Sequence, residues 1–260
     1  MSTLNIVNVA GAVTGRLGEP LLDVDAVHCV DGVITAFAAE DGADATLDAN
    51  GAVISPGLID THVHVTFGDW TPRQQTVGWI DSYMHGGTSM MMSASEIHVP
   101  GRPSDRAGLK GLAIAAQRCW ENLRPGGVKV LGGSVIVSPS LEESDFVELA
   151  AEGVWLAKVG FGEFGSQSEA APLVRAAQAA GFVVMNHTGG CSVPGSSAVS
   201  ADDVLALGCD IIGHANGGTT SLPDEDLERI FDAPGAIQLV QAGDLRSSPR
   251  MLELARARAA

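Results

Sequence analysis

The feature that most constrains the fold is an alternation of segments that runs from Ala52 to the end of the chain. Apolar runs end in polar or glycine-rich loops, and each run is followed by a segment of helical character. This order of elements is typical of βα units built around a parallel sheet. Seven runs are candidate strands: VISPGLIDTHVHV, TSMMMSA, VKVLGGSVIV, GVWLAKVG, FVVMNH, DIIGHA and AIQLVQAG.

The helical segments between these runs have recognisable start signals, at Pro72, Ser140, Ser168 and Leu222–Pro223. Seven consecutive βα units fit a (β/α)8 TIM-type barrel without its last unit. They fit an open doubly wound sheet less well, because no GxGxxG turn follows the first strand. The sequence therefore predicts an α/β barrel over residues 56–260.

Residues 1–55 have a different pattern, with short strand-like runs separated by turn residues. One of these turns is an Asp-Gly pair at Asp31 and Gly32, a strong hairpin signal. We expect a small N-terminal β domain before the barrel.

Charge and composition exclude several classes of partner. With 15 basic and 31 acidic residues the net charge is -16, so nucleic acid and anionic membranes are poor partners. The first residues lack a signal-peptide pattern, and no apolar run reaches the ~18 residues of a membrane span. Four widely spaced cysteines fit a reducing compartment. We expect a cytoplasmic protein.

The strongest chemical signal is His62-Val63-His64 at the end of the first apolar run. Residues two apart in a strand point to the same face, so the two imidazoles share one space and form half of a site for Zn²⁺ or a similar ion. The alternative is a pair of partly exposed strand histidines. Because His187 and His214 also end candidate strands, and parallel strand ends meet at one face of a barrel, we expect all four to converge.

Lys158 lies in the apolar stretch VWLAKVG, where burial of an unpaired ammonium is costly. One solution is for the long side chain to snorkel to the end of the strand. The other is a lowered pKa, which allows the neutral amine to react with CO2 and form a carbamate that bridges two metals. Beside four converging histidines, the bridging role is the better hypothesis.

These residues resemble a known family. VISPGLIDTHVHV resembles the first-strand signature of the amidohydrolase superfamily, whose metal-dependent members share a distorted (β/α)8 barrel. GDWTPRQ, GGTSMMMSASEIHVPGRP, HTGGCSVPGSS and GHANGGTTSLPDED are similar to the enamidase-like group within it. The resemblance covers essentially all of residues 3–250.

The resemblance implies a hydrolase that opens the ring of a cyclic amide, with a hydroxide between two divalent metals as the nucleophile. The metals are zinc, with iron as the alternative. His62 and His64 are implied to bind one ion, and His187 and His214 the other. The residue at the end of the fourth strand bridges both, and here it is Lys158 as a carboxylated lysine, where the enamidase pattern resembles a glutamate. Lys158 and His214 are also the predicted catalytic residues.

Family members carry an aspartate at the end of an eighth strand as the proton shuttle, and the sequence ends before such a strand. Strands one and seven would then expose unpaired edges. We expect this chain alone to be a homo-oligomer or poorly soluble and to hydrolyse little substrate. Asp244 is the nearest carboxylate in the sequence, with the pattern of an ordinary loop residue.

Weaker candidates lie in the loops. Arg73 and Arg102 are candidates to hold a substrate carboxylate, although a surface role is the better interpretation of each. His98 either polarises a substrate carbonyl or is a solvated loop residue. Cys191 as a nucleophile is disfavoured, because two metals make covalent catalysis unnecessary. Asp60 should point away from the histidine face, as a hydrogen-bonding residue.

Two other functions remain open. A metal-dependent deaminase has a similar barrel but usually one metal, so metal stoichiometry separates it from an amidohydrolase. The other function is a non-catalytic or split fragment that needs a complementary C-terminal piece.

Overall fold

The computed structural model divides the chain into two compact units, Met1–Leu58 and Ile59–Ala260. The division lies three residues beyond the expected boundary at residue 55, at the start of the first long strand. The structure describes residues 1–71, 75–95, 101–191, 195–217, 220–240 and 247–259. Arg73, His98 and Asp244 lie outside these ranges.

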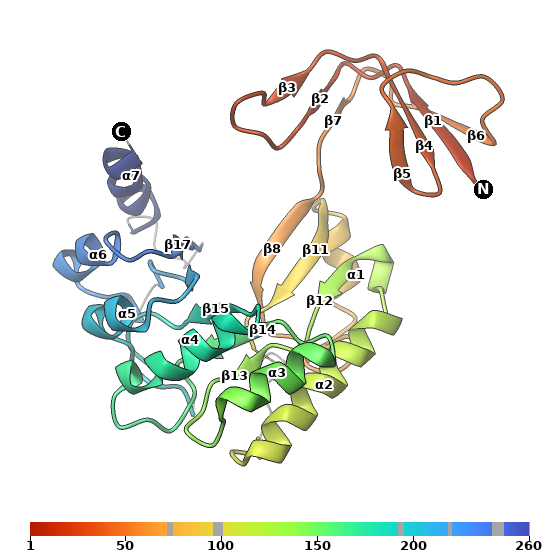
Figure 1. Cartoon of the computed structure of the whole chain (residues 1–260). Helices are drawn as coiled ribbons and strands as arrows, with labels where there is room; N and C mark the ends of the chain where they lie inside the picture. Colours follow the sequence, from red (N-terminus) through yellow and green to blue (C-terminus); the bar gives the residue numbers. More distant parts are fainter. Residues whose placement is uncertain (72–74, 96–100, 192–194, 218–219, 241–246, 260) are drawn as a thin grey trace. The chain divides into compact units, whose positions relative to one another are not determined.

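The first unit consists of two small sheets, as the turn-rich pattern of its sequence predicts (Figure 1). At the expected hairpin, Asp31 and Gly32 have φ values of 49° and 80°, the left-handed conformation that an Asp-Gly turn adopts. The four-stranded sheet has the order β5 (Val33–Ala36), β4 (Ala26–Val30), β1 (Thr3–Val7) and β6 (Ala45–Asp48). The three-stranded sheet has the order β3 (Leu21–Leu22), β2 (Gly11–Val13) and β7 (Val53–Ile54).

The seven predicted barrel strands lie in two sheets of the second unit, except that the start of the first, Val53–Ile54, forms β7 in the first unit. A short antiparallel pair, β9 (Trp70–Thr71) and β10 (Thr76–Val77), follows the first strand. The three-stranded sheet has the order β12 (Lys129–Leu131), β11 (Thr88–Ser93) and β8 (Leu58–Val63). The parallel five-stranded sheet has the order β13 (Val135–Ile136), β14 (Leu156–Val159), β15 (Val183–Asn186), β16 (Ile211–Ile212) and β17 (Ala236–Ile237).

The predicted third strand is broken in the middle, so β12 pairs with β11 while β13 pairs with β14. The break occurs at Gly132 and Gly133, where Gly133 has a φ of 81°. A Cβ on Gly132 would lie 2.2 Å from the Trp120 ring, and one on Gly133 would lie 2.9 Å from the Ala113 carbonyl oxygen. The two glycines therefore let helix α2 (Arg106–Asn122) approach the strand closely. The two halves of the broken strand belong to different sheets.

Helices follow the strands in the expected alternation. The predicted start of α3 at Ser140 is wrong by two residues: Glu142 is the N-cap, and the Asp145 side chain accepts from its N–H at 2.8 Å. Among the described residues, no helix is long and apolar enough to cross a membrane. The helices are α1 (Ile80–Met84), α2 (Arg106–Asn122), α3 (Glu143–Ala151), α4 (Ala171–Ala179), α5 (Ala201–Leu207), α6 (Asp224–Ile230) and α7 (Ser247–Ala259), with 3-10 turns at Pro125–Gly127 and Gln167–Ala170.

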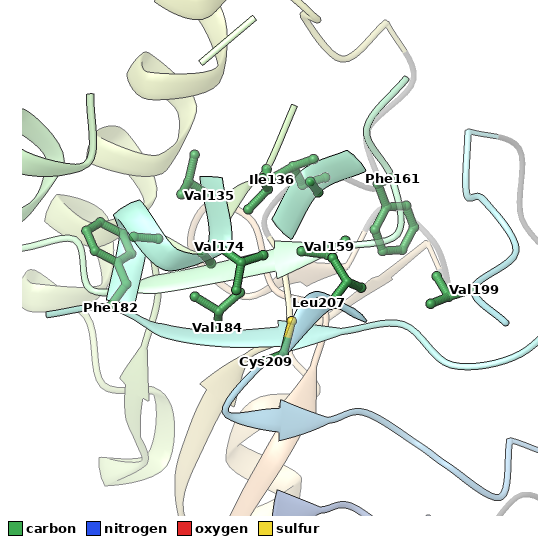
Figure 2. Packing of buried hydrophobic residues seen from close by; sticks show 14 of the residues in the cluster. Val135, Ile136, Val159, Phe161, Val174, Phe182, Val184, Val199, Leu207 and Cys209 are labelled. Carbon is green, nitrogen blue, oxygen red and sulfur yellow. The ribbon is translucent and has the colours of Figure 1, made fainter. Parts of the chain in front are cut away.

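The main core lies between the five-stranded sheet and the helices (Figure 2). Val159 and Val184 on β14 and β15 belong to the same buried cluster as Val174 of α4 and Leu207 of α5. Full burial of such a side chain stabilises the fold by ~1.5–3 kcal/mol. Leu156 and Met185, at alternate positions on β14 and β15, belong to a second cluster with Met92 of β11 and Ala94, which follows β11.

Candidate metal centre

The four histidines singled out in the sequence lie together in the second unit. The ring of His62 lies 5.3 Å from that of His64 and 4.9 Å from that of His214, measured between centroids. The His187 and His214 rings are 4.6 Å apart. His62 lies on β8, His187 directly follows β15, and His214 lies two residues beyond β16. Their convergence follows from the parallel order of the strands, and their role as metal ligands stays a prediction.

The backbone hydrogen bonds of β14 and β15 fix the position of His187. The His187 N–H donates to the Val159 carbonyl at 2.8 Å. Gly160 follows Val159 with a φ of 116°, and a Cβ there would lie 2.4 Å from the Cβ of His187. Gly160 therefore provides the space that His187 occupies.

The hydrogen bonds of the His187 ring define which of its nitrogens carries the proton. Its Nε2 lies 2.7 Å from the Gly190 carbonyl oxygen, which can only accept, so Nε2 is the donor and Nδ1 carries the lone pair. That Nδ1 faces Nε2 of His214 at 2.9 Å. A histidine whose outer nitrogen donates to a carbonyl is oriented as metal-ligating histidines are.

The His187–His214 pair could hold a divalent ion after a small adjustment. Two nitrogen ligands of a tetrahedral zinc ion, each ~2.0–2.1 Å from the metal, lie roughly 3.3 Å apart. His187 and His214 would have to separate by roughly 0.4 Å to reach this spacing. Among the described residues, no group of three or more His, Cys, Asp or Glu side chains already has the arrangement of a metal site.

Lys158 is enclosed in the protein, since 1% of its surface is exposed, so the snorkelling interpretation is wrong. It shares the inward face of β14 with Leu156, and its Nζ donates to the sulfur of Met185 at 3.2 Å. Burial lowers the pKa of the Lys158 ammonium to about 7. A large share of the side chain is therefore the neutral amine at neutral pH.

Lys158 and the histidines influence one another electrostatically. The pKa of His62 is lowered well below its usual value, first by burial and then by the positive charges of Lys158 and His214. A hydrogen bond with Gln238 opposes this shift. His62 is therefore neutral near pH 7, which is the form that binds a metal.

Some loop candidates have other partners. Arg102 is partly engaged by the backbone, because its Nη2 donates to the carbonyls of Phe161 at 2.8 Å and Gly195 at 3.2 Å. Asp60 accepts from the backbone N–H of His62 at 3.0 Å, which fits its expected hydrogen-bonding role. Cys191 is exposed.

The sequence interpretation missed two polar groups beside the histidines. Gln238 directly follows β17 and contacts His62, and Ser95 Oγ lies 3.4 Å from Nδ1 of His64. A signal for Gln238 was present, because it is a polar residue between apolar neighbours in the seventh run, AIQLVQAG.

Solved structures place this fold in a family. A crystal structure of enamidase, described as a new member of the amidohydrolase superfamily, superposes with a TM-score of 0.91 at 43% identity, over 99% of this chain and 69% of that one. A dihydroorotase structure matches with a TM-score of 0.61 at 20% identity, over the whole of this chain and 70% of that one. No family model matches the sequence. The chain belongs to the amidohydrolase superfamily, and its fold is the α/β barrel type of that superfamily.

Within the superfamily the chain is similar to a characterised enzyme. It is 45% identical over 251 residues to enamidase of Eubacterium barkeri, over 94% of this chain. It spans 65% of that relative's length, slightly less than two thirds.

Proposed function

We propose that this chain forms the metal-binding, substrate-facing part of an amidohydrolase that hydrolyses a carbon–nitrogen bond of a cyclic amide. The observation that carries the proposal is the convergence of four imidazoles at the ends of β8, β15 and β16. The outer nitrogen of His187 is fixed by a carbonyl acceptor, so its lone pair faces the cluster. The similarity to enamidase supports the substrate class.

In this proposal His62 and His64 hold one divalent ion, and His187 and His214 hold the second. Bound there, the ions supply Lewis-acid polarisation of the amide carbonyl and activation of water. A carboxylated Lys158 would help to hold both ions. Its neutral amine attacks CO2: an N–C bond forms as one C=O π bond breaks, the nitrogen releases one proton, and the neutral amine becomes a carbamate anion. The negative charge removes the repulsion that an ammonium would exert on two cations.

The inner face of the sheets gives the site an apolar floor. Leu156 and Met185, together with Met92 of β11, lie in the cluster beside Lys158. Such a floor keeps water away from the amine and strengthens charge interactions at the site. Because this floor is apolar, the polar groups of the site are the four histidines, and a substrate amide would bind toward them.

The proposal is tested first by metal content. We expect the full chain, loaded with zinc or iron in bicarbonate and desalted, to retain two ions by mass spectrometry of the metals. His187→Ala and His64→Ala should each lose at least one ion. His85→Ala is the matched control, because His85 is exposed at the end of α1. Equal metal content in all four proteins would contradict the assignment.

The reaction class is tested with paired substrates. We expect the low hydrolytic activity of this chain to favour cyclic amides over linear amides of similar size, and amino-substituted heterocycles to remain intact. Release of ammonia from the heterocycles, with one ion bound, would favour the deaminase alternative. The choice of zinc or iron, the homo-oligomeric state and the cytoplasmic location stay predictions.

A further inference from the structure

Gln238 occupies a position that the backbone holds firmly. Its N–H donates to the Ile212 carbonyl at 2.9 Å, and its own carbonyl accepts from the Ala215 N–H at 2.9 Å. These bonds extend the pairing of β16 with β17 past the last strand residue, Ile237. The side chain of Gln238 therefore starts from a fixed point beside His214.

The amide of Gln238 uses both of its ends. Its Nε2 donates to the Thr61 carbonyl at 3.2 Å and to Thr61 Oγ1 at 2.6 Å. Its Oε1 lies 3.2 Å from the backbone N–H of His214 and 2.5 Å from Nδ1 of His62. Two donors and two acceptor sites are all that a glutamine amide offers, and all four are used.

The partners determine which way the amide is turned. The Thr61 carbonyl can only accept, so it must face the NH2 group. The His214 N–H can only donate, so it must face the oxygen. A flipped amide would bring two acceptors together at Thr61 and two donors together at His214.

The orientation of the amide in turn determines the tautomer of His62. Because Nδ1 of His62 faces an oxygen at 2.5 Å, Nδ1 must carry the proton. The lone pair of His62 is then on Nε2. The same oxygen holds the backbone of His214, whose φ of 36° is in the left-handed region that non-glycine residues rarely adopt.

We propose that Gln238 is a positioning residue of the candidate metal centre. It fixes His62 as the tautomer with its lone pair on Nε2, and it ties β8 to the backbone of His214. The claim that Gln238 supports metal binding rests on the proposed function. The claim that Gln238 fixes the His62 tautomer concerns the metal-free chain and is tested separately.

The first test reads the tautomer of His62 directly. Long-range ¹H–¹⁵N spectra of the metal-free chain labelled with ¹⁵N-histidine distinguish a protonated nitrogen from a lone-pair nitrogen, and His62→Ala identifies the His62 signals. We expect the Nδ1–H form in the unmodified chain. In Gln238→Met, which keeps the shape and removes all four bonds, we expect a mixture of tautomers. An unchanged His62 spectrum in Gln238→Met would overturn the inference.

Two further variants separate positioning from general damage. Gln238→Glu keeps an oxygen toward His62 and His214, so we expect the Nδ1–H form to persist. Gln178→Met is the matched control, because Gln178 is also half-buried and donates one hydrogen bond, to the Gly208 carbonyl at 3.0 Å, on helix α4. Circular dichroism checks that each variant is folded. A mixture of tautomers in the control would overturn the inference as well.

The second test measures zinc binding by competition with a chelator. Loss of a residue that orients a ligating histidine typically weakens metal binding by about 10- to 100-fold. We expect this loss in Gln238→Met, a smaller loss in Gln238→Glu, and less than about 3-fold in Gln178→Met. Unchanged affinity in Gln238→Met would refute the positioning role. If the unmodified chain bound no zinc, the proposed function would fail, while the His62 spectrum would still decide whether Gln238 fixes the tautomer.

Discussion

Replacement of Gly160 by alanine tests whether the placement of His187 depends on the missing side chain. The Gly160 backbone has a φ of 116°, and the added methyl group would lie 2.4 Å from the Cβ of His187. Ordinary carbon–carbon contacts are ~3.5–4.0 Å, so the two residues would have to separate by more than ~1 Å. A residue held in a rare backbone conformation costs of order 1–3 kcal/mol, and overpacking adds ~1–3 kcal/mol. We expect Gly160→Ala to lower the free energy of unfolding by about 2–6 kcal/mol.

Gly181→Ala separates the two contributions. Gly181 also has a positive φ, of 89°, but an added Cβ would find nothing within 4 Å. Its substitution should therefore cost only the backbone part, of order 1–3 kcal/mol. The difference between the variants measures the overlap with His187.

Urea unfolding followed by tryptophan fluorescence is the assay. All four tryptophans, Trp70, Trp79, Trp120 and Trp155, belong to the unit Ile59–Ala260, so the signal reports the unit that contains the site. Zinc affinity is measured in parallel. A shift of His187 by about 1 Å exceeds the ~0.5 Å within which a site must be held, so Gly160→Ala should bind zinc more weakly than Gly181→Ala. Equal stability and equal affinity in the two variants would refute the steric argument.

Three further outcomes are expected. Lys158→Met should retain fewer than two ions, and added bicarbonate should raise metal loading in the unmodified chain only; identical loading with and without bicarbonate would contradict the carboxylated lysine. Burial raises the pKa of Asp145, but hydrogen bonds from Lys110, the Glu142 backbone and Arg106 outweigh this effect and keep the pKa below its usual value. The stability that ionised Asp145 contributes is therefore present above pH ~4 and is lost as the pH falls through the lowered pKa. Asp145→Asn should flatten this acid-side slope in urea titrations. Ser200→Ala removes the N-cap of α5 and should lower the free energy of unfolding by ~1 kcal/mol, whereas an unchanged urea midpoint would contradict the capping assignment.

The alternation of apolar runs and helices predicted the strands well, because a parallel strand buried on both faces must be apolar along its length. It did not predict the interruption at Gly132 and Gly133. That interruption depends on how closely helix α2 approaches, which is a tertiary contact. The alternation predicted a helix after the run FVVMNH but gave no start signal for it, and in the structure α5 begins after its N-cap Ser200.

The convergence of the histidines was predictable for a general reason, and the details of their hydrogen bonds were not. Parallel order brings every strand end to one face, so a histidine at the end of a strand is placed by topology alone. The pairing of Gln238 with His62 requires two residues 176 positions apart to lie within 2.5 Å. Such a contact depends on how far the end of β17 lies from β8, and the sequence pattern carries no information about that distance.

Lys158 shows the same limit on a finer scale. The sequence indicated a costly buried ammonium but left its solution open between snorkelling and chemical modification. The structure decides against snorkelling because Lys158 pairs in register with Met185, two residues before His187 on the neighbouring strand. At that depth the side chain contacts the sulfur of Met185, a weak acceptor, instead of solvent. Burial without a strong partner favours the neutral amine, which is the form that can react with CO2. The position of the residue along the strand, which sets its depth, therefore makes the modification chemically accessible.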